Sequence, residues 1–386
     1  MPVPVYFFSL ERNSRELRDA DSRSLTYDRV LAGATSFLLR RSFPKEGLAN
    51  ALAAVKVHFG EPGNFTFIPA HFIAPIVGAL EAAHLKPFLT DTNVIYDSAR
   101  SDAVGHAAAA REHGFAAPCL GAPIIIADGL VGESFIEVEI GGKWFKRVKI
   151  AEAVASAGSL VVVSHAKAHA LMGFSGAIKN LGMGCASKRG KEEQHSGRFV
   201  IDISACVKCG RCLVKCGSGA ISKSFEIDQR LCNGCGQCYA ECLDGAIRKS
   251  TGQDDETDIF PEKVCEYALG AVKGKMVICV SFLINIVPYC DCNARADLPM
   301  VPDIGILFSS DPVAIDQAAF DLINRSKPVK GSVLARKPRR PDHFSALFAE
   351  SHPDKQMRYG KKIGLGTNKY VLADIQDCFA PAAKKH

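Results

Sequence analysis

Long apolar runs are missing from this chain of 386 residues. No run reaches the roughly 18 consecutive apolar residues that a membrane-spanning helix needs, and the nearest candidate, residues 276–288, is too short and is interpreted as a buried strand. Residues 1–16 also lack the basic start, apolar stretch and small-residue cleavage site of a secretory signal. We therefore expect a cytoplasmic protein without a membrane span.

Several cofactor-binding patterns are missing as well. The glycine spacing of dinucleotide-binding folds and that of nucleotide-binding P-loops are both absent. So are a flavin or nicotinamide motif and the C-x3-C-x2-C spacing of radical S-adenosylmethionine enzymes. The sequence thus offers no support for hydride transfer or for radical chemistry of that type.

The composition is that of an ordinary globular protein, with 47% hydrophobic and 23% charged residues. The length suggests two or three domains. The net charge is +6, and the basic excess is greatest in residues 325–341, which hold seven Lys or Arg and no acidic residue. Because no nucleic-acid-binding motif accompanies this segment, we interpret it as a solvated loop or a patch for an acidic redox partner, and we do not expect nucleic acid as a partner.

Cysteine, by contrast, is plentiful: eight of the fifteen cysteines form two runs of one pattern. The first run is Cys206-x2-Cys209-x2-Cys212-x3-Cys216, and the second is Cys232-x2-Cys235-x2-Cys238-x3-Cys242. This is the spacing of bacterial two-cluster ferredoxins, in which cysteine thiolates hold two 4Fe-4S clusters. The pattern predicts one-electron transfer and an anaerobic setting.

The same spacing predicts which cysteine binds which cluster. In such ferredoxins three cysteines of a run hold one cluster, and the fourth reaches the other. The predicted ligands are Cys206, Cys209, Cys212 and Cys242 for one cluster, and Cys232, Cys235, Cys238 and Cys216 for the other. Zinc is a less favoured alternative, because a zinc site needs neither the third cysteine of each run nor a fourth cysteine three residues further on. A disulfide framework is also less favoured, because a chain of this length does not need one.

The two runs are halves of an internal repeat, the second starting 26 residues after the first. Each half predicts a short strand, a cluster-binding loop, a helical turn and a second strand. The proline that usually follows the fourth cysteine is replaced by Gly217 and Leu243; since that proline shapes the turn without binding the cluster, we still expect both clusters. Residues 199–249 carry seven basic and five acidic side chains, which suits the receiving end of a relay better than a freely diffusing, acidic carrier.

The segments on either side of the repeat alternate between strand and helix patterns. Buried strands are predicted at residues 54–59, 86–90, 123–127, 160–164, 276–282 and 304–308, and helices at 72–84, 98–113, 261–272 and 312–324. Such alternation predicts an α/β fold, with a mostly parallel sheet covered by helices, interrupted by an inserted α+β two-cluster ferredoxin-like domain. The predicted boundaries are 1–197 and 251–386 for the two parts of the α/β domain, and 198–250 for the insertion.

These flanking segments resemble the domain-of-unknown-function family 362, many of whose members carry a ferredoxin insertion. The resemblance rests on residues 56–61, 90–96 with Arg100 and His106, 164–169, 173–188, 194–195, 290–292, 301–306 and 311–316. It covers nearly the whole chain. Because the chemistry of the family is largely unsettled, the resemblance implies a fold and an iron–sulfur insertion but no particular reaction.

Polar residues at the ends of predicted strands suggest a second site, because open α/β sheets bind their ligands there. The candidate substrate-binding residues are His58, Asp91, Asn93, Lys167, His169, Lys179 and Asn180. The last two lie in residues 173–184, a run with four glycines that predicts close backbone approach to a small anionic substrate. The alternative is a tight turn that starts a helix and packs against the sheet.

Three further cysteines, Cys185, Cys290 and Cys292, form a sharper hypothesis. Soft ligands from two distant loops could hold a third iron–sulfur cluster with one iron open, or another metal, with His169 or His195 as a fourth ligand. The alternative is three ordinary thiols, with or without a redox-active pair. The remaining cysteines, interpreted as core residues, are Cys119, Cys265, Cys279 and Cys378.

The sequence leaves three functions open. The leading one is electron transfer, in which the two clusters pass low-potential electrons to a site in the α/β domain or to a redox partner protein. The second is a reductase, an iron–sulfur oxidoreductase whose substrate binds at Cys185, Cys290 and Cys292. The third is a redox sensor or assembly factor that binds a partner according to the state of its clusters.

Overall fold

An eight-stranded sheet forms the centre of the computed structural model, which describes residues 2–10, 26–42, 51–195, 198–242, 244–250 and 256–378. Residues 11–16, part of the segment compared with a secretory signal, lie outside these ranges. So does Leu243, one of the two residues that replace the usual proline. In spatial order the strands are β14 (Tyr370–Asp374), β1 (Val3–Ser9), β13 (Gly305–Ser309), β12 (Met276–Leu283), β7 (Ser159–His165), β2 (Leu52–Lys56), β3 (Lys86–Asp91) and β4 (Ile124–Ile126). The six strands predicted from apolar runs are confirmed as β2, β3, β4, β7, β12 and β13.

The sheet is mostly parallel, as predicted. Each neighbouring pair runs parallel except the two pairs that β13 makes with β12 and β1. The central strands have near-continuous apolar sequence because both faces of the sheet are covered, and all seven residues of β7 are buried. The reversed direction of β13 was not predicted, since a strand's own sequence carries no mark of its direction.

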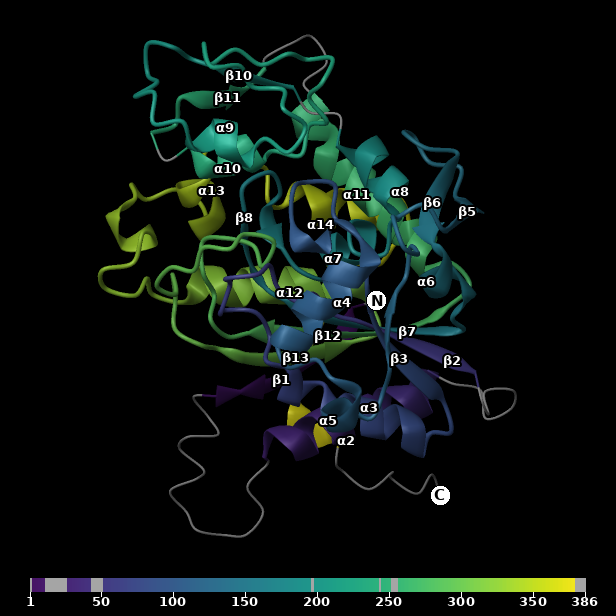
Figure 1. Cartoon of the computed structure of the whole chain (residues 1–386). Coiled ribbons are helices and arrows are strands. Elements are labelled where there is room, and N and C mark those ends of the chain that lie inside the picture. Colours follow the sequence, from purple (N-terminus) through teal and green to yellow (C-terminus); the bar gives the residue numbers. More distant parts are fainter. Residues whose placement is uncertain are drawn as a thin grey trace, which may run out of the picture.

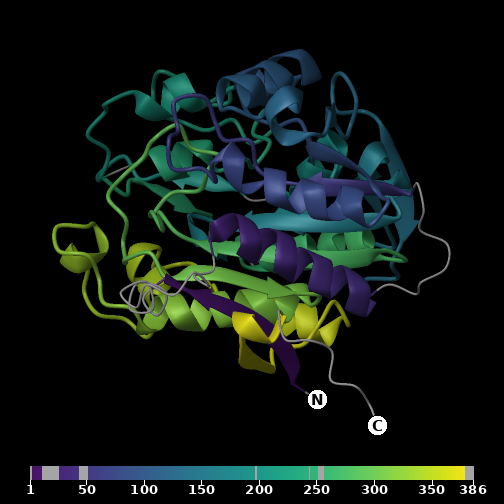
Figure 2. The same cartoon turned by 90° about the horizontal axis from the view of Figure 1, so that it is seen from below.

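Helices cover both faces of the sheet (Figure 1). On one side lie α2 (Tyr27–Ser42), α3 (Ala74–Ala82) and α5 (Ala117–Leu120), and on the other lie α7 (Ala177–Gly182), α11 (Glu256–Val272), α12 (Pro312–Arg325) and α14 (Lys355–Lys362). Figure 2 shows α2 and α3 lying across the sheet. The two layers enclose separate cores, which contain Leu31 and Leu80 on the first side and Ile178, Val264 and Met357 on the second.

Residues 198–250 form a small unit at the top of Figure 1. Its elements are β10 (Phe199–Ile201), α9 (Arg211–Lys215), α10 (Gln237–Glu241) and β11 (Ile247–Lys249). β10 and β11 pair antiparallel, and the Ser250 amide donates to the Arg198 carbonyl oxygen at 2.9 Å, so the entry and exit of the unit lie side by side. α9 and α10 occupy equivalent places in the repeat, each after a glycine in the left-handed region, Gly210 or Gly236, a conformation that only glycine adopts without steric cost.

Two short hairpins lie between β4 and α7 in the sequence. The first pairs β5 (Phe135–Glu139) with β6 (Arg147–Ala151), and the second pairs β8 (Lys167–His169) with β9 (Gly173–Ser175). Because β8 follows directly on β7, it brings Lys167 and His169 to the carboxyl end of the sheet. Among the described helices, none has both the length and the apolar character needed to cross a membrane.

Candidate functional site

A cavity of about 150 Å³ lies at the carboxyl ends of the parallel strands. Its lining includes residues that end three neighbouring strands, namely Lys56 of β2, Asp91 of β3 and His165 of β7. The loop around Cys235, from the 198–250 unit, also lines it. This is the position at which open α/β sheets bind their ligands.

Most of the residues predicted from strand ends meet at this cavity. Six of the seven line it: His58, Asp91, Lys167, His169, Lys179 and Asn180. The seventh, Asn93, is fully buried, and its side-chain amide donates to Asp128 Oδ1 at 3.0 Å and to the Gly129 carbonyl oxygen at 2.8 Å. Asn93 therefore ties two loops together and is not among the cavity-lining residues.

Asp91 is the centre of a buried charge network. Its carboxylate lies 3.0 Å from Lys56 Nζ and 3.6 Å from Arg100 Nη1. Arg100 also pairs with Glu61 at 2.7 Å and donates to the Tyr96 hydroxyl at 2.6 Å. Burial alone would raise the pKa of Asp91, but the Lys56 ammonium and the neighbouring His106 and His58 side chains together outweigh it and hold that pKa well below its usual range. The carboxylate stays ionised, and the network fixes Lys56 and Arg100 in place.

Asp291 anchors the loop that carries Cys290 and Cys292. Its carboxylate accepts a hydrogen bond from Lys167 Nζ at 2.6 Å and faces His165 Nδ1 at 3.0 Å. Burial opposes ionisation, yet Lys167 and His165 hold the pKa of Asp291 well below its usual range. Because Asp291 separates the two cysteines in sequence, these contacts position both thiols at the cavity.

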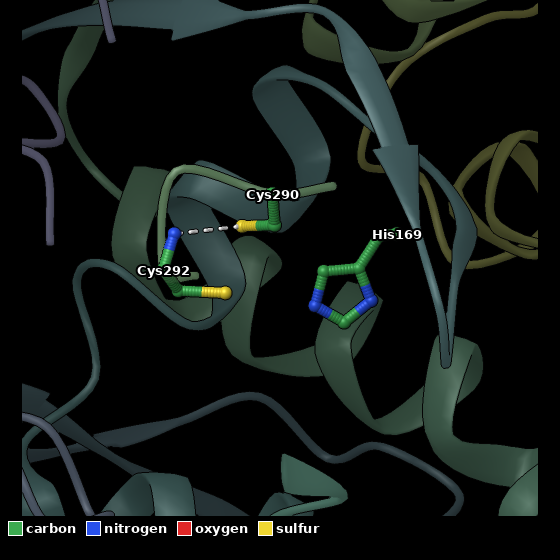
Figure 3. A group of neighbouring side chains, drawn as sticks. All are labelled: His169, Cys290 and Cys292. Carbon is green, nitrogen blue, oxygen red and sulfur yellow. Dashed lines mark hydrogen bonds between the residues drawn. The ribbon is translucent and has the colours of Figure 1, made fainter. Parts of the chain in front are cut away.

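Cys290, Cys292 and His169 lie close together (Figure 3), and one ligand atom from each lies within 4.8 Å of the other two. The Cys292 amide donates to Cys290 Sγ at 3.4 Å, and Lys179 Nζ lies 3.3 Å from the same sulfur. Hydrogen bonding from Cys292 and the charge of Lys179 lower the pKa of Cys290, whereas the bond to Cys290 raises the pKa of Cys292. The pair therefore favours a single thiolate, on Cys290.

These three side chains could hold a metal ion, since two sulfurs and an imidazole suit zinc and other transition metals. The imidazole is the weaker ligand. His169 Nδ1 accepts hydrogen bonds from the amides of Leu171 and Met172, each at 3.2 Å, so the proton of the neutral ring belongs on Nε2, the nitrogen that faces the sulfurs. A metal ion would have to replace that proton, and the two amide contacts disfavour the tautomer it needs. The two thiols are therefore the stronger ligands.

Cys185 lies apart from this group. Its side chain is fully buried in the hydrophobic core, its sulfur lies 3.9 Å from the Asn180 carbonyl oxygen, and it is not among the residues that line the cavity. Burial raises the pKa of the Cys185 thiol to about 12, which keeps it neutral. His169, and not Cys185, is the third member that the structure brings to the Cys290–Cys292 pair.

Of the four cysteines interpreted as core residues, three are buried: Cys265, Cys279 and Cys378. Cys119 is exposed, so that interpretation was wrong. It lies on α5, a four-residue helix at the edge of the α3 layer. An apolar sequence context does not bury every residue of so short a helix.

The eight cysteines of the repeat gather in two groups of four. Cys206, Cys209, Cys212 and Cys242 line one small cavity, and Cys216, Cys232, Cys235 and Cys238 line another. In each group three cysteines come from one run and the fourth comes from the other. The second group also borders the cavity at the strand ends, because Cys235 lines both. We call the strand-end cavity the large cavity, since its volume is about 150 Å³ against about 20 Å³ for each of the two cysteine-lined cavities.

Specific contacts hold the 198–250 unit against the rest of the chain. Asn233 Nδ2 donates to the Ile95 carbonyl oxygen at 3.1 Å, beside the cavity wall. The buried carboxylate of Glu241 pairs with Arg295 at 2.6 Å. Both contacts join the second half of the repeat to loops that line or border the cavity.

The glycine at position 217 belongs to the same interface. A Cβ atom on Gly217 would lie 2.8 Å from both the Cβ and the backbone nitrogen of Asp97, closer than real Cβ contacts allow. The proline that usually follows the fourth cysteine would therefore collide with the neighbouring loop. Close docking of the unit is the physical reason for this departure from the usual pattern.

Several cavity residues were not predicted as site residues. They are Lys56, Thr92, Tyr96, Arg100, His165, Lys191, Gln237, Tyr289 and Asp291. His195, predicted as an alternative fourth metal ligand, also lines the cavity but is not a member of the Cys290, Cys292 and His169 group. The strand-end rule could have identified Lys56 and His165, which end β2 and β7. Lys191 lies on α8 (Lys188–Gln194), and no local pattern marks a helical lysine as part of a distant site.

The chain belongs to the family described as domain of unknown function (DUF362), whose model matches residues 53–321. No curated protein matches the sequence. Two solved structures are similar at 12% sequence identity: a crystal structure of a protein from Thermotoga maritima (TM-score 0.36, 67% of this chain and 51% of that one), and the lactate racemase apoprotein from Thermoanaerobacterium thermosaccharolyticum (TM-score 0.31, 65% and 49%). The matches span about half the length of each of those proteins.

Proposed function

We propose that this protein is an iron–sulfur electron-transfer protein, in which residues 198–250 form an inserted ferredoxin-like domain with two 4Fe-4S clusters. The observation that carries the proposal is the gathering of eight cysteines into two groups of four, each combining three members of one run with the fourth of the other. Four thiolates in that combination are the ligand set of a two-cluster ferredoxin. The Lys208 amide, which donates to Cys206 Sγ at 3.4 Å, adds the type of hydrogen bond that stabilises a cluster thiolate.

The position of the second cysteine group supports transfer into the rest of the chain. Cys235 borders the large cavity, and Gln237 from the same loop lines it. Bound clusters supply one electron each. We propose that the acceptor of those electrons is bound in the cavity, within an α/β domain made of residues 1–197 and 251–386, or is a redox partner protein.

Two cysteine substitutions test the cluster assignment. On anaerobically purified, reduced protein, Cys206→Ser and Cys235→Ser should each lose about four of about eight irons per chain, together with the magnetic interaction between two clusters in electron paramagnetic resonance. Cys119→Ser removes an exposed thiol outside both groups and should keep all iron. Full iron content in either site variant would contradict the assignment.

The second candidate is a reductase whose substrate binds in the large cavity. It is favoured by the Cys290, Cys292 and His169 group, which lies in the cavity that Cys235 borders. A metal ion held chiefly by the two thiols would provide an open coordination position for a substrate.

Metal analysis separates this candidate from simple electron transfer. The reductase predicts metal in addition to about eight cluster irons, lost in Cys290→Ser and Cys292→Ser and kept in Cys185→Ala. Loss of that metal in Cys185→Ala would instead favour the three-cysteine grouping predicted from sequence. No metal beyond the two clusters would leave the cavity without a metal centre.

A further inference from the structure

The large cavity carries more positive charge than its carboxylates balance. Five cationic side chains line it: Lys56, Arg100, Lys167, Lys179 and Lys191. Among the described lining residues only Asp91 and Asp291 carry carboxylates, and Glu61, behind Arg100, adds a third. Charges taken out of water need a counter-charge, so the excess requires an explanation.

The three carboxylates are already committed to three of the cations. Asp91 pairs with Lys56 at 3.0 Å, Asp291 with Lys167 at 2.6 Å, and Glu61 with Arg100 at 2.7 Å. Within the described ranges, no ion pair includes Lys179 or Lys191. The excess charge therefore resides on these two lysines.

Lys179 and Lys191 have polar contacts that do not neutralise them. The Lys191 ammonium is buried and donates to the backbone carbonyl oxygens of Thr92, at 3.1 Å, and Asn93. The Lys179 ammonium touches Cys290 Sγ at 3.3 Å. Lys191 is attracted by Asp128 from beyond ion-pair distance, so among the described residues no carboxylate contacts either ammonium.

His58 adds a neutral donor to the same cavity. Its Nδ1 accepts a hydrogen bond from the Gly60 amide at 3.0 Å, whereas Arg100 Nη1 lies 3.5 Å from Nε2; the shorter contact is the stronger hydrogen bond and favours the tautomer with the proton on Nε2. Burial and the charge of Arg100 hold the pKa of His58 well below its usual range. The ring is therefore neutral, and its Nε2–H is available as a donor to a ligand.

We propose that the cavity binds a compact oxyanion, a small carboxylate or phosphate compound, whose negative oxygens are met by Lys179, Lys191 and His58. The volume, about 150 Å³, is that of a cavity that holds one benzene-sized molecule, so the ligand is a small molecule. This deepens the proposed function, on which its role rests, because a ligand at this position lies beside the Cys235 loop. Binding itself depends on the two lysines and His58 and is tested without any electron transfer.

Calorimetric titration of the full-length, anaerobically purified protein provides the test, with inorganic phosphate and oxalate as separate probes at constant ionic strength. At least one of them should bind saturably, and the better probe distinguishes a phosphate from a carboxylate ligand. Lys179→Met should weaken binding by about tenfold or more, the usual loss for one charge-assisted hydrogen bond. Lys330→Met, an exposed lysine elsewhere, is the control and should bind as the wild type does.

Two results would overturn the proposal. The first is that neither anion binds saturably. The second is that Lys179→Met and His58→Leu both bind the anion as tightly as the wild type does, which would mean that the positive charge of the lysines only balances the thiolates. Should Lys179→Met fail to fold, judged by thermal unfolding, His58→Leu decides. Iron measured on the same samples separates the two proposals. Iron-loaded protein without anion binding contradicts only this inference, whereas anion binding by protein without clusters contradicts only the relay.

Discussion

At the scale of single residues, the site depends on buried ion pairs that orient other groups. Asp291 is the clearest case, because its carboxylate holds Lys167 and His165 while its neighbours in sequence supply the two cavity thiols. Removing one partner of a buried pair leaves the other charged and uncompensated. The importance of such a residue cannot be predicted from the sequence alone, because it depends on partners that are distant along the chain.

Replacement of Asp291 by asparagine should therefore be costly. The change keeps the size of the side chain but leaves Lys167 buried beside a neutral amide, and we expect the free energy of unfolding to fall by about 3–5 kcal/mol. Asp354→Asn removes a partner from the exposed Arg358 pair and should change stability by less than about 1 kcal/mol. Denaturant unfolding of both variants measures this, and equal stabilities would refute the role given to Asp291.

The sequence predicted six of the cavity residues because strand ends converge in a parallel sheet, and this convergence is a general property of the fold. It misplaced Cys185, whose neighbour Gly184 lines the cavity, because adjacent residues can point in opposite directions. It missed Lys191 and the pairing of Asp291, because both depend on which distant segments meet. Local patterns predict position along a strand, but the direction of a side chain depends on packing.

At the scale of elements, α7 is positioned by a residue from another helix. Asp316 of α12 accepts hydrogen bonds from the amides of Ala177 at 2.6 Å and Ile178 at 2.8 Å, which satisfy donors that a helix start leaves free. α7 carries Lys179 and Asn180 into the cavity. The orientation of Lys179 thus depends on the buried carboxylate of Asp316, which lies outside the site.

This carboxylate should make stability depend on pH. Burial raises the pKa of Asp316 to about 7, so between about pH 4 and about pH 7 the folded chain keeps a proton that the unfolded chain has lost. Stability should then fall as pH rises through that range, by up to about 1.4 kcal/mol per unit, and the fall should be absent in Asp316→Asn. Unfolding curves from about pH 5.5 to about pH 8 compare the two slopes; parallel profiles would show that Asp316 does not titrate there.

Strand prediction succeeded where the sheet is covered on both faces, because such strands are continuous apolar runs. It failed for β14, which lies at the edge of the sheet and is partly exposed, since half-exposed strands lack that signal. β1 joins the sheet between β14 and β13 and was not predicted either. The antiparallel insertion of β13 reflects pairing between distant segments, and no local pattern reports it.

At the scale of the whole molecule, the 198–250 unit docks closely beside the large cavity. From the sequence we expected an inserted unit at residues 198–250, but not the surface on which it lies. The contacts of Asn233 and Glu241 define that surface. Gly217, which replaces the usual proline, is the sequence feature that this docking surface explains.

Side chains added at position 217 should therefore weaken docking. Gly217→Ala and Gly217→Pro both push against Asp97, and we expect a loss of about 1–3 kcal/mol from overpacking with iron content unchanged. Gly78→Ala is the matched control, because a Cβ there meets nothing within 4 Å and alanine suits a helix better than glycine. Thermal unfolding with iron analysis measures both, and a fully stable Gly217→Pro variant would contradict the docking described here.

The most direct test of the central claim is the iron and acid-labile sulfide content of anaerobically purified protein, measured with electron paramagnetic resonance of its reduced form. The account predicts about eight irons and about eight sulfides per chain, with signals from two interacting 4Fe-4S clusters. Zinc in place of iron, or cysteines that bind no metal in protein purified without oxygen, would contradict it.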